Sequence, residues 1–299
     1  MLRKKSFIKR LINYFERKGY TNILSDKQYL KLMHWTIMDR KLDLRNPRSF
    51  NEKLQWLKLY NRKDIYTTLV DKYDVKKYIA SIIGEACVIP SLGVWRKFED
   101  INFDLLPNHF VLKCTHDSGR AIVCVDKNKL DKDKIREKIN KSLNRNYYWF
   151  GREWPYKNVE PRVMAEVYME DENDSKGLRD YKFFCFNNEP KFLYVSEGLE
   201  DHATAKISFF DFNGKRLPFG RSDYRPMPAE IELPETMSKM KDMAKLIAEK
   251  IDSPFVRVDL YSIKGQIYFS EITFFPCSGH MPFEPESWDE KLGDWISLE

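Results

Sequence analysis

The sequence predicts an α+β protein in which helices come first and strands follow. Up to about residue 85, apolar side chains recur at helical spacing, whereas from about residue 86 they alternate with a period of two. No internal repeat or low-complexity linker interrupts this order. A helical block followed by a strand-rich block is typical of the α+β class. A chain of 299 residues is long enough for two or three packed subdomains.

The first expected helix, within residues 1–18, is amphipathic. Lysines and arginines surround its apolar face. Such a helix either packs on its own domain, which is the interpretation we favour, or lies on an anionic membrane surface. The apolar residues at helical spacing are Phe7, Ile8, Leu11, Ile12 and Phe15.

Three more helices are expected before residue 85. One covers about 26–40. The next covers 49–60, where Ser49 followed by Glu52 is a capping signal. The third covers 74–83 and ends at a glycine, which is the usual residue after a helix.

Strands dominate the second block, with Asn, Gly and Pro turns between them. Two polar or amphipathic helices, 131–146 and about 235–250, interrupt the series. The expected strands lie within 86–90, 109–114, 120–126, 162–169, 180–187 and 190–198, and a hairpin over 255–276 follows them.

The composition excludes several classes of protein. Apolar residues make up 42% of the chain and aromatic residues 14%, which is too much for a disordered protein. No apolar run is long enough to predict a membrane-spanning helix, and residues 1–20 lack the pattern of a secretory signal. Five scattered cysteines without a C-x-x-C pair are typical of reduced thiols in a cytoplasmic protein. The net charge of +6 is the small difference between many basic and many acidic residues, which are mixed along the chain. The sequence also contains no known nucleic-acid-binding motif, so we expect no nucleic-acid partner.

The hairpin "FVRVDLYSIKGQIYFSEITFFP" (255–276) contains charged residues in an otherwise apolar stretch. In its first arm, strand alternation places Arg257 and Asp259 on one face. In its second arm, Glu271 and Thr273 also share a face. Two carboxylates and a hydroxyl are hard oxygen ligands that suit Mg²⁺.

The register of the hairpin decides whether its two acids can meet. A two-residue turn at Lys264–Gly265 places Asp259 opposite Ser270, whereas a three-residue turn or an equivalent bulge places it opposite Glu271. Carboxylates so close together repel and need a cation between them. That cation is either a metal ion or Arg257, which can bridge both acids in an ion-pair network.

Three other segments carry candidate chemistry, each with a plainer alternative. In "FVLKCTHDSGRAIVC" (110–124), Lys113 and the Ser118-Gly119 turn can hold a phosphate, but an ordinary hairpin has the same pattern. Glu166 in "RVMAEVYM" either accepts from a ribose hydroxyl or is a strand acid that faces solvent. Lys182, within an apolar strand, needs a partner, which is either a phosphate or a core carboxylate.

Several sequence segments, in their order along the chain, resemble the TupA-like ATP-grasp family. This family is found with genes for surface and cell-wall polysaccharides. The resemblance extends from about residue 26 to the end of the chain. The segments that carry it are "SFNEKLQWLKLY", "LVDKYDVKKY", "FVLKCTHDSG", "DYKFFCFNNEPKF", "FVRVDLY" and "YFSEITFFPCSGH".

The resemblance implies an ATP-grasp fold, in which two α+β subdomains clasp ATP behind an N-terminal helical region. The expected divisions are 1–65 for the helical region, 66–107 for a preceding helix and strand segment, 108–165 for the lid subdomain and 166–299 for the core with the metal-binding hairpin. By the same resemblance, the nucleotide-binding residues are Lys72, Lys113, Ser118, Gly119, Glu166, Val167, Tyr168, Met169 and Lys182.

The resemblance also implies the roles of the reacting groups. Arg257 corresponds to the position that stabilises charge near the transferred phosphoryl group, and the catalytic candidates are Arg257, Lys113 and His116. Asp259, Glu271 and Thr273 correspond to the ligands of Mg²⁺. Two positions depart from the family pattern. Arg120 stands where many grasp loops have another glycine, and Thr273 replaces the usual Asn.

The activity that the resemblance implies is ATP-dependent ligation of a carboxylate to an amine through an acylphosphate. The carboxylate is expected on a uronic acid or an acidic residue of a surface polysaccharide or its precursor, and the amine on an amino acid.

A Mg²⁺-dependent glycosyltransferase, a kinase-like phosphotransferase and a basic peripheral scaffold are the alternatives. The enzyme is expected in the cytoplasm, and the alternative in which residues 1–18 lie on lipid places it at the inner membrane surface. Candidates for the acceptor pocket are Arg152, Tyr156, His202, Arg221, Arg225 and His280.

Overall fold

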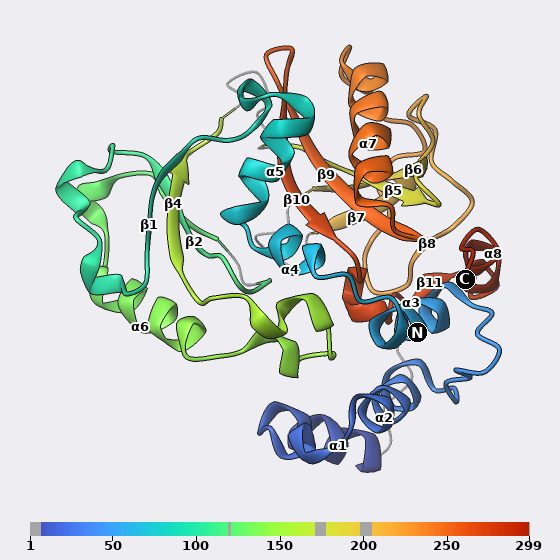
Figure 1. Cartoon of the computed structure of the whole chain (residues 1–299). Coiled ribbons are helices and arrows are strands. Elements are labelled where there is room, and N and C mark those ends of the chain that lie inside the picture. Colours follow the sequence, from blue (N-terminus) through green and yellow to red (C-terminus); the bar gives the residue numbers. More distant parts are fainter. Residues whose placement is uncertain (1–6, 119–120, 171–177, 198–204, 299) are drawn as a thin grey trace.

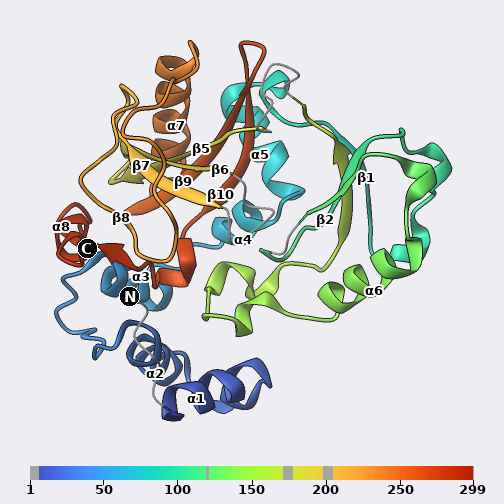
Figure 2. The ribbon, with the colours of Figure 1, turned by 180° about the vertical axis from the view of Figure 1, so that it is seen from behind.

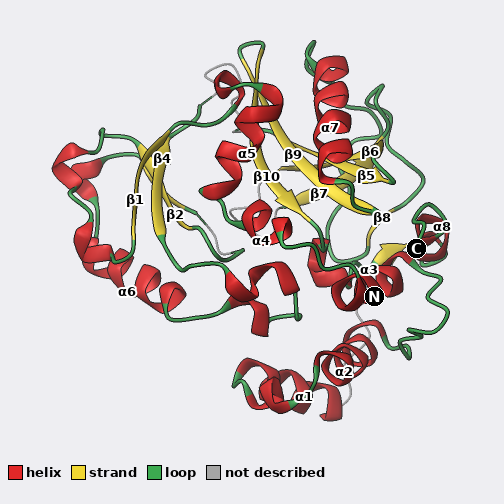
Figure 3. Cartoon of the chain, viewed as in Figure 1, coloured by secondary structure: helices red, strands yellow, loops and turns green. Residues whose placement is uncertain are grey.

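The strands of the chain form two main antiparallel sheets with helices between and around them (Figures 1 and 3). The computed structural model describes residues 7–118, 121–170, 178–197 and 205–298. Every helix in this part of the chain is too short or too polar to span a membrane.

The larger sheet has five strands in the order β10-β9-β5-β6-β7. Every neighbouring pair in it is antiparallel. Helix α7 (Met237–Ile251) packs on β5, β6 and β9 and covers one face of the sheet. The strands are β5 (Asp180–Phe186), β6 (Glu189–Glu197), β7 (Lys206–Phe210), β9 (Phe255–Ile263) and β10 (Gln266–Thr273).

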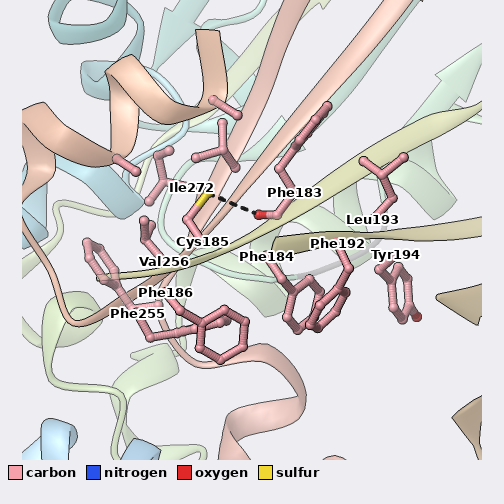
Figure 4. Packing of buried hydrophobic residues seen from close by; sticks show 14 of the residues in the cluster. Phe183, Phe184, Cys185, Phe186, Phe192, Leu193, Tyr194, Phe255, Val256 and Ile272 are labelled. Atoms are coloured by element: carbon pink, nitrogen blue, oxygen red, sulfur yellow. Dashed lines mark hydrogen bonds between the residues drawn. The ribbon is translucent and has the colours of Figure 1, made fainter. Parts of the chain in front are cut away.

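Period-two alternation divides the opposite face of this sheet into an apolar part and a charged part. Figure 4 shows Phe184 and Phe186 on one side of β5 and Cys185 on the other. The ring of Phe50, from helix α3 (Phe50–Tyr60), packs edge-on against Phe255 at 4.9 Å and also contacts Phe184 and Phe186. Further along the same face, the strand positions are occupied by charged residues. These are Asp180 and Lys182 of β5 and Arg257 and Asp259 of β9.

The smaller sheet has four strands in the order β1-β4-β2-β3 and its own hydrophobic core. Phe110, Leu112 and Cys114 of β2 face that core together with Ile135 and Ile139 of helix α6 (Lys132–Leu143). Lys113 lies on the other face of β2. The strands are β1 (Ser91–Trp95), β2 (Phe110–Cys114), β3 (Ile122–Cys124) and β4 (Val163–Val167).

Helices connect the two sheets and extend from them. In both Figures 1 and 2, α4 (Ile65–Val70) and α5 (Asp74–Ile83) lie between the sheets, whereas α1 (Phe7–Arg17) and α2 (Asp26–Met38) lie at the periphery. Complete capping boxes start α2 at Ser25 and α3 at Ser49, as expected for Ser49. The remaining elements are β8 (Gly220–Arg221), β11 (Phe283–Glu284) and α8 (Trp288–Gly293), together with the 3-10 helices Tyr20–Ile23, Glu85–Cys87, Phe98–Asp100, Phe103–Leu105, Lys127–Lys129, Tyr147–Trp149, Trp154–Asn158 and Pro276–Gly279.

One expected strand is wrong, and one expected division falls within a strand. Residues 86–90 form no strand, because a 3-10 helix occupies Glu85–Cys87 and Val88 makes only an isolated bridge to Phe269. Pro90 lacks an N–H to continue a ladder, and the strand starts after it, at Ser91. The division expected between 165 and 166 lies inside β4.

Two histidines meet where the N-terminal helices join the main subdomain. The rings of His34 in α2 and His280 lie 5.7 Å apart, and both side chains are buried. Burial lowers the pKa of His34 to about 4, although the negative charge of Glu52 opposes this effect. Nδ1 of His34 has no hydrogen-bond partner among the described residues. His34 is therefore neutral at pH 7, in an environment that opposes its protonation.

We expect His34 to make the folded state sensitive to acid. Because its pKa is lower in the folded state, the unfolded chain takes up the proton first as the pH falls from about 6.5 to 4. The contribution to the free energy of unfolding declines over that window by up to about 3 kcal/mol. Urea denaturation of the wild type and His34→Leu across this range measures it. His109→Gln, which changes an exposed histidine, is the control and should follow the wild type. Equal pH slopes for all three proteins contradict this expectation.

Candidate functional site

A bulge in the hairpin β9–β10 brings its two carboxylates together. The turn has two residues, Lys264 and Gly265, both with positive φ. The register shifts between Phe269 and Glu271, so Ser270 is the extra residue and Glu271 lies opposite Asp259. The alternative with an equivalent bulge is therefore confirmed, and the three-residue turn is not formed.

Arg257 bridges the two acids from the same face of the hairpin. Its Nε donates to Asp259 Oδ1 at 2.7 Å, and its Nη2 donates to Asp259 Oδ2 at 2.6 Å and to Glu271 Oε1 at 2.7 Å. Asp259 is fully buried, whereas 39% of the Glu271 side chain is exposed. The charged cluster therefore presents one acid to solvent and holds the other beneath it.

The neighbouring strand β5 extends this cluster with a second cation. Lys182 pairs with Asp259 across the sheet, and its Nζ lies 3.0 Å from Asp259 Oδ2. It also forms an ion pair with Asp180, two residues away on the same strand face. Carboxylates are thus the partners of Lys182 in this structure. We call Asp180, Lys182, Arg257, Asp259 and Glu271 the charged cluster; it holds three acids and two bases.

The positive charges of the cluster lower the pKa of its acids, whereas burial raises it. Partial burial raises the pKa of Glu271, but the positive charges of Arg257, Lys182 and Lys72 outweigh that effect and lower the pKa to about 2. Burial also raises the pKa of Asp259, and there the positive charges of Arg257 and Lys182 offset only part of the rise. The exposed acid of the pair is therefore held firmly ionised.

The oxygen atoms of this face fit a hard divalent cation that also binds phosphate. Asp259 and Glu271 are adjacent, and Thr273 Oγ1 lies 3.4 Å from Glu271 Oε1. No cluster of three or more Asp, Glu, His or Cys side chains suited to a metal occurs within the described ranges. Two carboxylates match Mg²⁺, which keeps several waters or phosphate oxygens, better than a metal that needs a complete protein cage.

A second ion-pair cluster lies in the smaller sheet. Glu166 occupies β4, between β1 and β2, and is buried, so its alternative interpretation as a solvent-facing acid is wrong. It forms an ion pair with Lys113 and another with Lys76 of α5 at 2.5 Å. Burial raises the pKa of Glu166, but the two lysines outweigh this effect and lower it. Two ammonium groups thus converge on one carboxylate between the sheets.

The residues that follow β2 form hydrogen bonds with the segment between α4 and α5 and with α6. Lys72 Nζ donates to the carbonyl of Asp117, and its positive charge also contributes to the low pKa of Glu271. His116 is buried, and its Nε2 lies 3.0 Å from the carbonyl oxygen of Ser142. This contact places His116 within the smaller subdomain. Gly119, the other expected loop residue, lies outside the described residues.

A hollow of about 260 Å³ opens beside Ser118, which is exposed. Tyr147 lines it, and burial together with the negative charges of Glu153, Asp117 and Glu271 raises the pKa of Tyr147. Tyr147 therefore lies within electrostatic range of both the loop and the hairpin. The other lining residues include Ser142, Arg145 and Phe150.

The remaining expected residues are scattered. Val167 donates its N–H to the carbonyl of Pro90 at 3.1 Å, and Tyr168 and Met169 follow it half-buried at the end of β4. Arg152 is buried against Asp26, Tyr148 and three backbone carbonyls, which is a structural position. Of the other acceptor candidates, Tyr156 is half-buried, Arg221 pairs with Asp223, Arg225 is exposed, His280 is buried and His202 lies outside the described residues.

A strained turn that follows β10 is held by a buried lysine, which the sequence did not reveal. Cys277 and Ser278 both adopt the left-handed conformation, with φ of 51° and 52°. Lys58 of α3 donates to the Ser278 carbonyl at 2.8 Å and to the Gly151 carbonyl at 2.7 Å. Burial lowers the pKa of Lys58, and Glu153 opposes this shift. Lys58 and Ser278 are 220 positions apart, so no local pattern links them.

Lys58→Met is expected to destabilise this turn. The substitution keeps an unbranched apolar chain but removes the lysine's donation to the Gly151 carbonyl and the Ser278 hydroxyl, and leaves the Ser278 carbonyl with Gln55 Nε2 as its donor. We expect the free energy of unfolding to fall by about 1–3 kcal/mol, measured by urea denaturation. Lys191→Met, at an exposed position of β6, is the matched control and should have little effect. Equal effects of both substitutions contradict the assigned role of Lys58.

Crystal structures of several ATP-grasp proteins show a weak likeness to the chain. The D-alanine–D-alanine ligase from Helicobacter pylori is 16% identical, with 84% of this chain and 70% of that chain covered and a TM-score of 0.48. The Bacillus anthracis ligase with ATP is 18% identical over 69% of this chain and 55% of that one, with a TM-score of 0.42. A RimK domain protein from Sphaerobacter thermophilus is 12% identical over 79% and 70%, with a TM-score of 0.44.

The chain thus spans just over half of the Bacillus anthracis ligase, and TM-scores below 0.5 carry no argument about function. No curated protein sequence matches the chain. The profile of one family, TupA-like ATPgrasp, matches residues 52–297, a range that includes both main sheets and the whole charged cluster. The chain therefore belongs to the TupA-like ATP-grasp family and has its α+β fold.

Proposed function

We propose that the protein is an ADP-forming carboxylate–amine ligase. The observation that carries this proposal is the pair of adjacent carboxylates, Asp259 and Glu271, bridged by Arg257 in a member of the ATP-grasp family. An arginine and two acids on one strand face can hold both a polyphosphate and the cation that accompanies it. Within this proposal, Asp259, Glu271 and Thr273 hold Mg²⁺, which supplies positive charge to the phosphate oxygens.

The reaction needs positioning and charge neutralisation rather than a protein nucleophile. A substrate carboxylate oxygen attacks the γ-phosphorus, the bond to the β-phosphate oxygen breaks, and ADP leaves. The amine nitrogen then attacks the acyl carbon, inorganic phosphate departs, and the nitrogen loses a proton as the amide forms. Arg257 stabilises the negative charge on the transferred phosphoryl group.

The lysines of the smaller subdomain are proposed to contact the nucleotide. Lys113 and Lys76 converge on Glu166, which keeps their ammonium groups in place between the two sheets. We assign phosphate contacts to Lys113 and Lys72 and ribose and adenine contacts to the stretch from Glu166 to Met169. Ser118, Gly119, His116 and Lys182 complete the proposed set of residues around the nucleotide.

The substrate class rests on the association of the family with polysaccharide genes. We propose that the carboxylate belongs to a uronic acid or an acidic residue of a surface polysaccharide or its precursor, and the amine to an amino acid. We place this ATP-consuming reaction in the cytoplasm.

The products distinguish this reaction from its alternatives. Incubation with ATP, Mg²⁺, uronic acids and an amino-acid mixture should release ADP and give one amide-linked product, which mass spectrometry identifies. Glu271→Gln should reduce ADP release by about 100-fold or more, because it removes the exposed charge of the carboxylate pair. Glu137→Gln, which changes an exposed acid of α6, should leave the rate unchanged. A phosphorylated product without an amide indicates a kinase, and a glycoside without ADP indicates a glycosyltransferase; either contradicts the proposal.

Lys113→Met should weaken ATP binding by about tenfold or more, because one charged phosphate contact is lost. Isothermal titration calorimetry with ATP and Mg²⁺ measures the change, and the exposed-site variant Lys191→Met is again the control. Wild-type affinity in Lys113→Met would exclude this lysine from the nucleotide site.

A further inference from the structure

The N-terminal helix exposes its apolar side. Phe7 is 77% exposed, and in the 3-10 helix that follows α1, Tyr20 is 63% and Ile23 90% exposed. A cluster of this kind on two consecutive helices is larger than the isolated apolar residues that occur on most protein surfaces. The seven exposed apolar residues, which we call the N-terminal patch, are Phe7, Ile8, Leu11, Tyr14, Phe15, Tyr20 and Ile23.

Helical geometry places the α1 members of the patch on one side. At 3.6 residues per turn they fall within roughly one third of the circumference. Arg10 and Arg17, both exposed, follow along one edge of this arc, and Lys18 lies within it, with its Nζ 5.8 Å from the ring centroid of Tyr14. The patch is therefore an apolar stripe with arginines along one edge and a lysine at its C-terminal end.

Contacts on the opposite side fix this orientation. Lys9 is buried, pairs with Asp39 after α2, and lies 5.1 Å over the ring of Trp35. Ile12 packs on the small core of the N-terminal helices. The helix thus packs on its own domain, but of its five predicted apolar residues only Ile12 faces that domain. The other four face outward.

We propose that the N-terminal patch docks on an anionic membrane surface. Charge argues for lipid over a second apolar protein surface, because residues 1–23 contain seven basic residues and one acidic residue. An apolar stripe with aromatic residues and a basic margin is the pattern of a helix lying in the membrane interface. Both cartoon views place α1 at the periphery, away from the two sheets (Figures 1 and 2).

The test uses the full chain and vesicles of defined composition. Cosedimentation is measured with phosphatidylcholine vesicles that contain about one third phosphatidylglycerol, and with pure phosphatidylcholine vesicles. We expect binding to the anionic vesicles only, and weaker binding as salt rises, because screening reduces the attraction of exposed charges. Equal binding to both vesicle types, or none to either, overturns the proposal.

Matched variants show whether the patch is the contact. Phe7→Ser combined with Leu11→Ser should reduce binding to anionic vesicles by about tenfold or more, because apolar insertion is lost. Leu105→Ser is the control, since Leu105 is 82% exposed but lies in the smaller subdomain. Circular dichroism confirms that all variants fold, which the exposure of the changed residues leads us to expect.

A competing occupant of the patch is a second copy of the chain. Size-exclusion chromatography with light scattering, without lipid, measures this directly. A dimer that Phe7→Ser and Leu11→Ser dissociate, together with unchanged vesicle binding of that variant, contradicts membrane docking. A wild-type chain that is monomeric without lipid supports it. Because the patch lies outside the proposed active site, ADP release in solution should be the same in the variant and the wild type, so failure of docking leaves the ligase proposal intact.

Discussion

The site depends on one residue more in β10 than in the facing part of β9. Ser270 is that residue, and its bulge places Glu271 opposite Asp259 rather than Val258. Two carboxylates side by side repel, so the arrangement persists only because Arg257 donates to both and Lys182 donates to the buried one. The pairing of cations and anions across three strands therefore fixes the position of the acids that the proposed chemistry uses.

The rest of the larger subdomain supports that pairing. Aromatic residues fill the neighbouring part of the same sheet face, where Phe50 of α3 packs on Phe184 and Phe255. The same helix provides Lys58, which holds the strained turn directly after β10. Helix α3 thus packs on the apolar part of the sheet face and also holds the turn that follows β10, the strand that carries Glu271. Lys72 adds a link to the smaller sheet, because it bonds the Asp117 carbonyl while its charge acts on Glu271.

Local sequence patterns predicted the structural features that depend on residues close together in the chain. Alternation placed Arg257 and Asp259 on one face, and the helices around Ser49 and over 74–83 followed from capping and spacing. The register of the hairpin β9–β10 could be predicted only for each possible turn or bulge, because a bulge depends on the pairing of both strands. Asp180 could have been found from its position two residues before Lys182. The contact of Lys58 with Ser278 could not be predicted in this way. The outward face of α1 could not either, because it depends on the ion pair between the buried Lys9 and the distant Asp39.

We propose that Asp259 and Glu271 hold the metal that accompanies ATP. A crystal structure of the full chain with Mg²⁺ and a non-hydrolysable ATP analogue tests it most directly. We expect a metal bound to oxygen atoms of both residues and to phosphate oxygens, with Arg257 directed at the terminal phosphate. A nucleotide bound elsewhere, or an Arg257–Asp259–Glu271 network that is unchanged and free of metal, would contradict it.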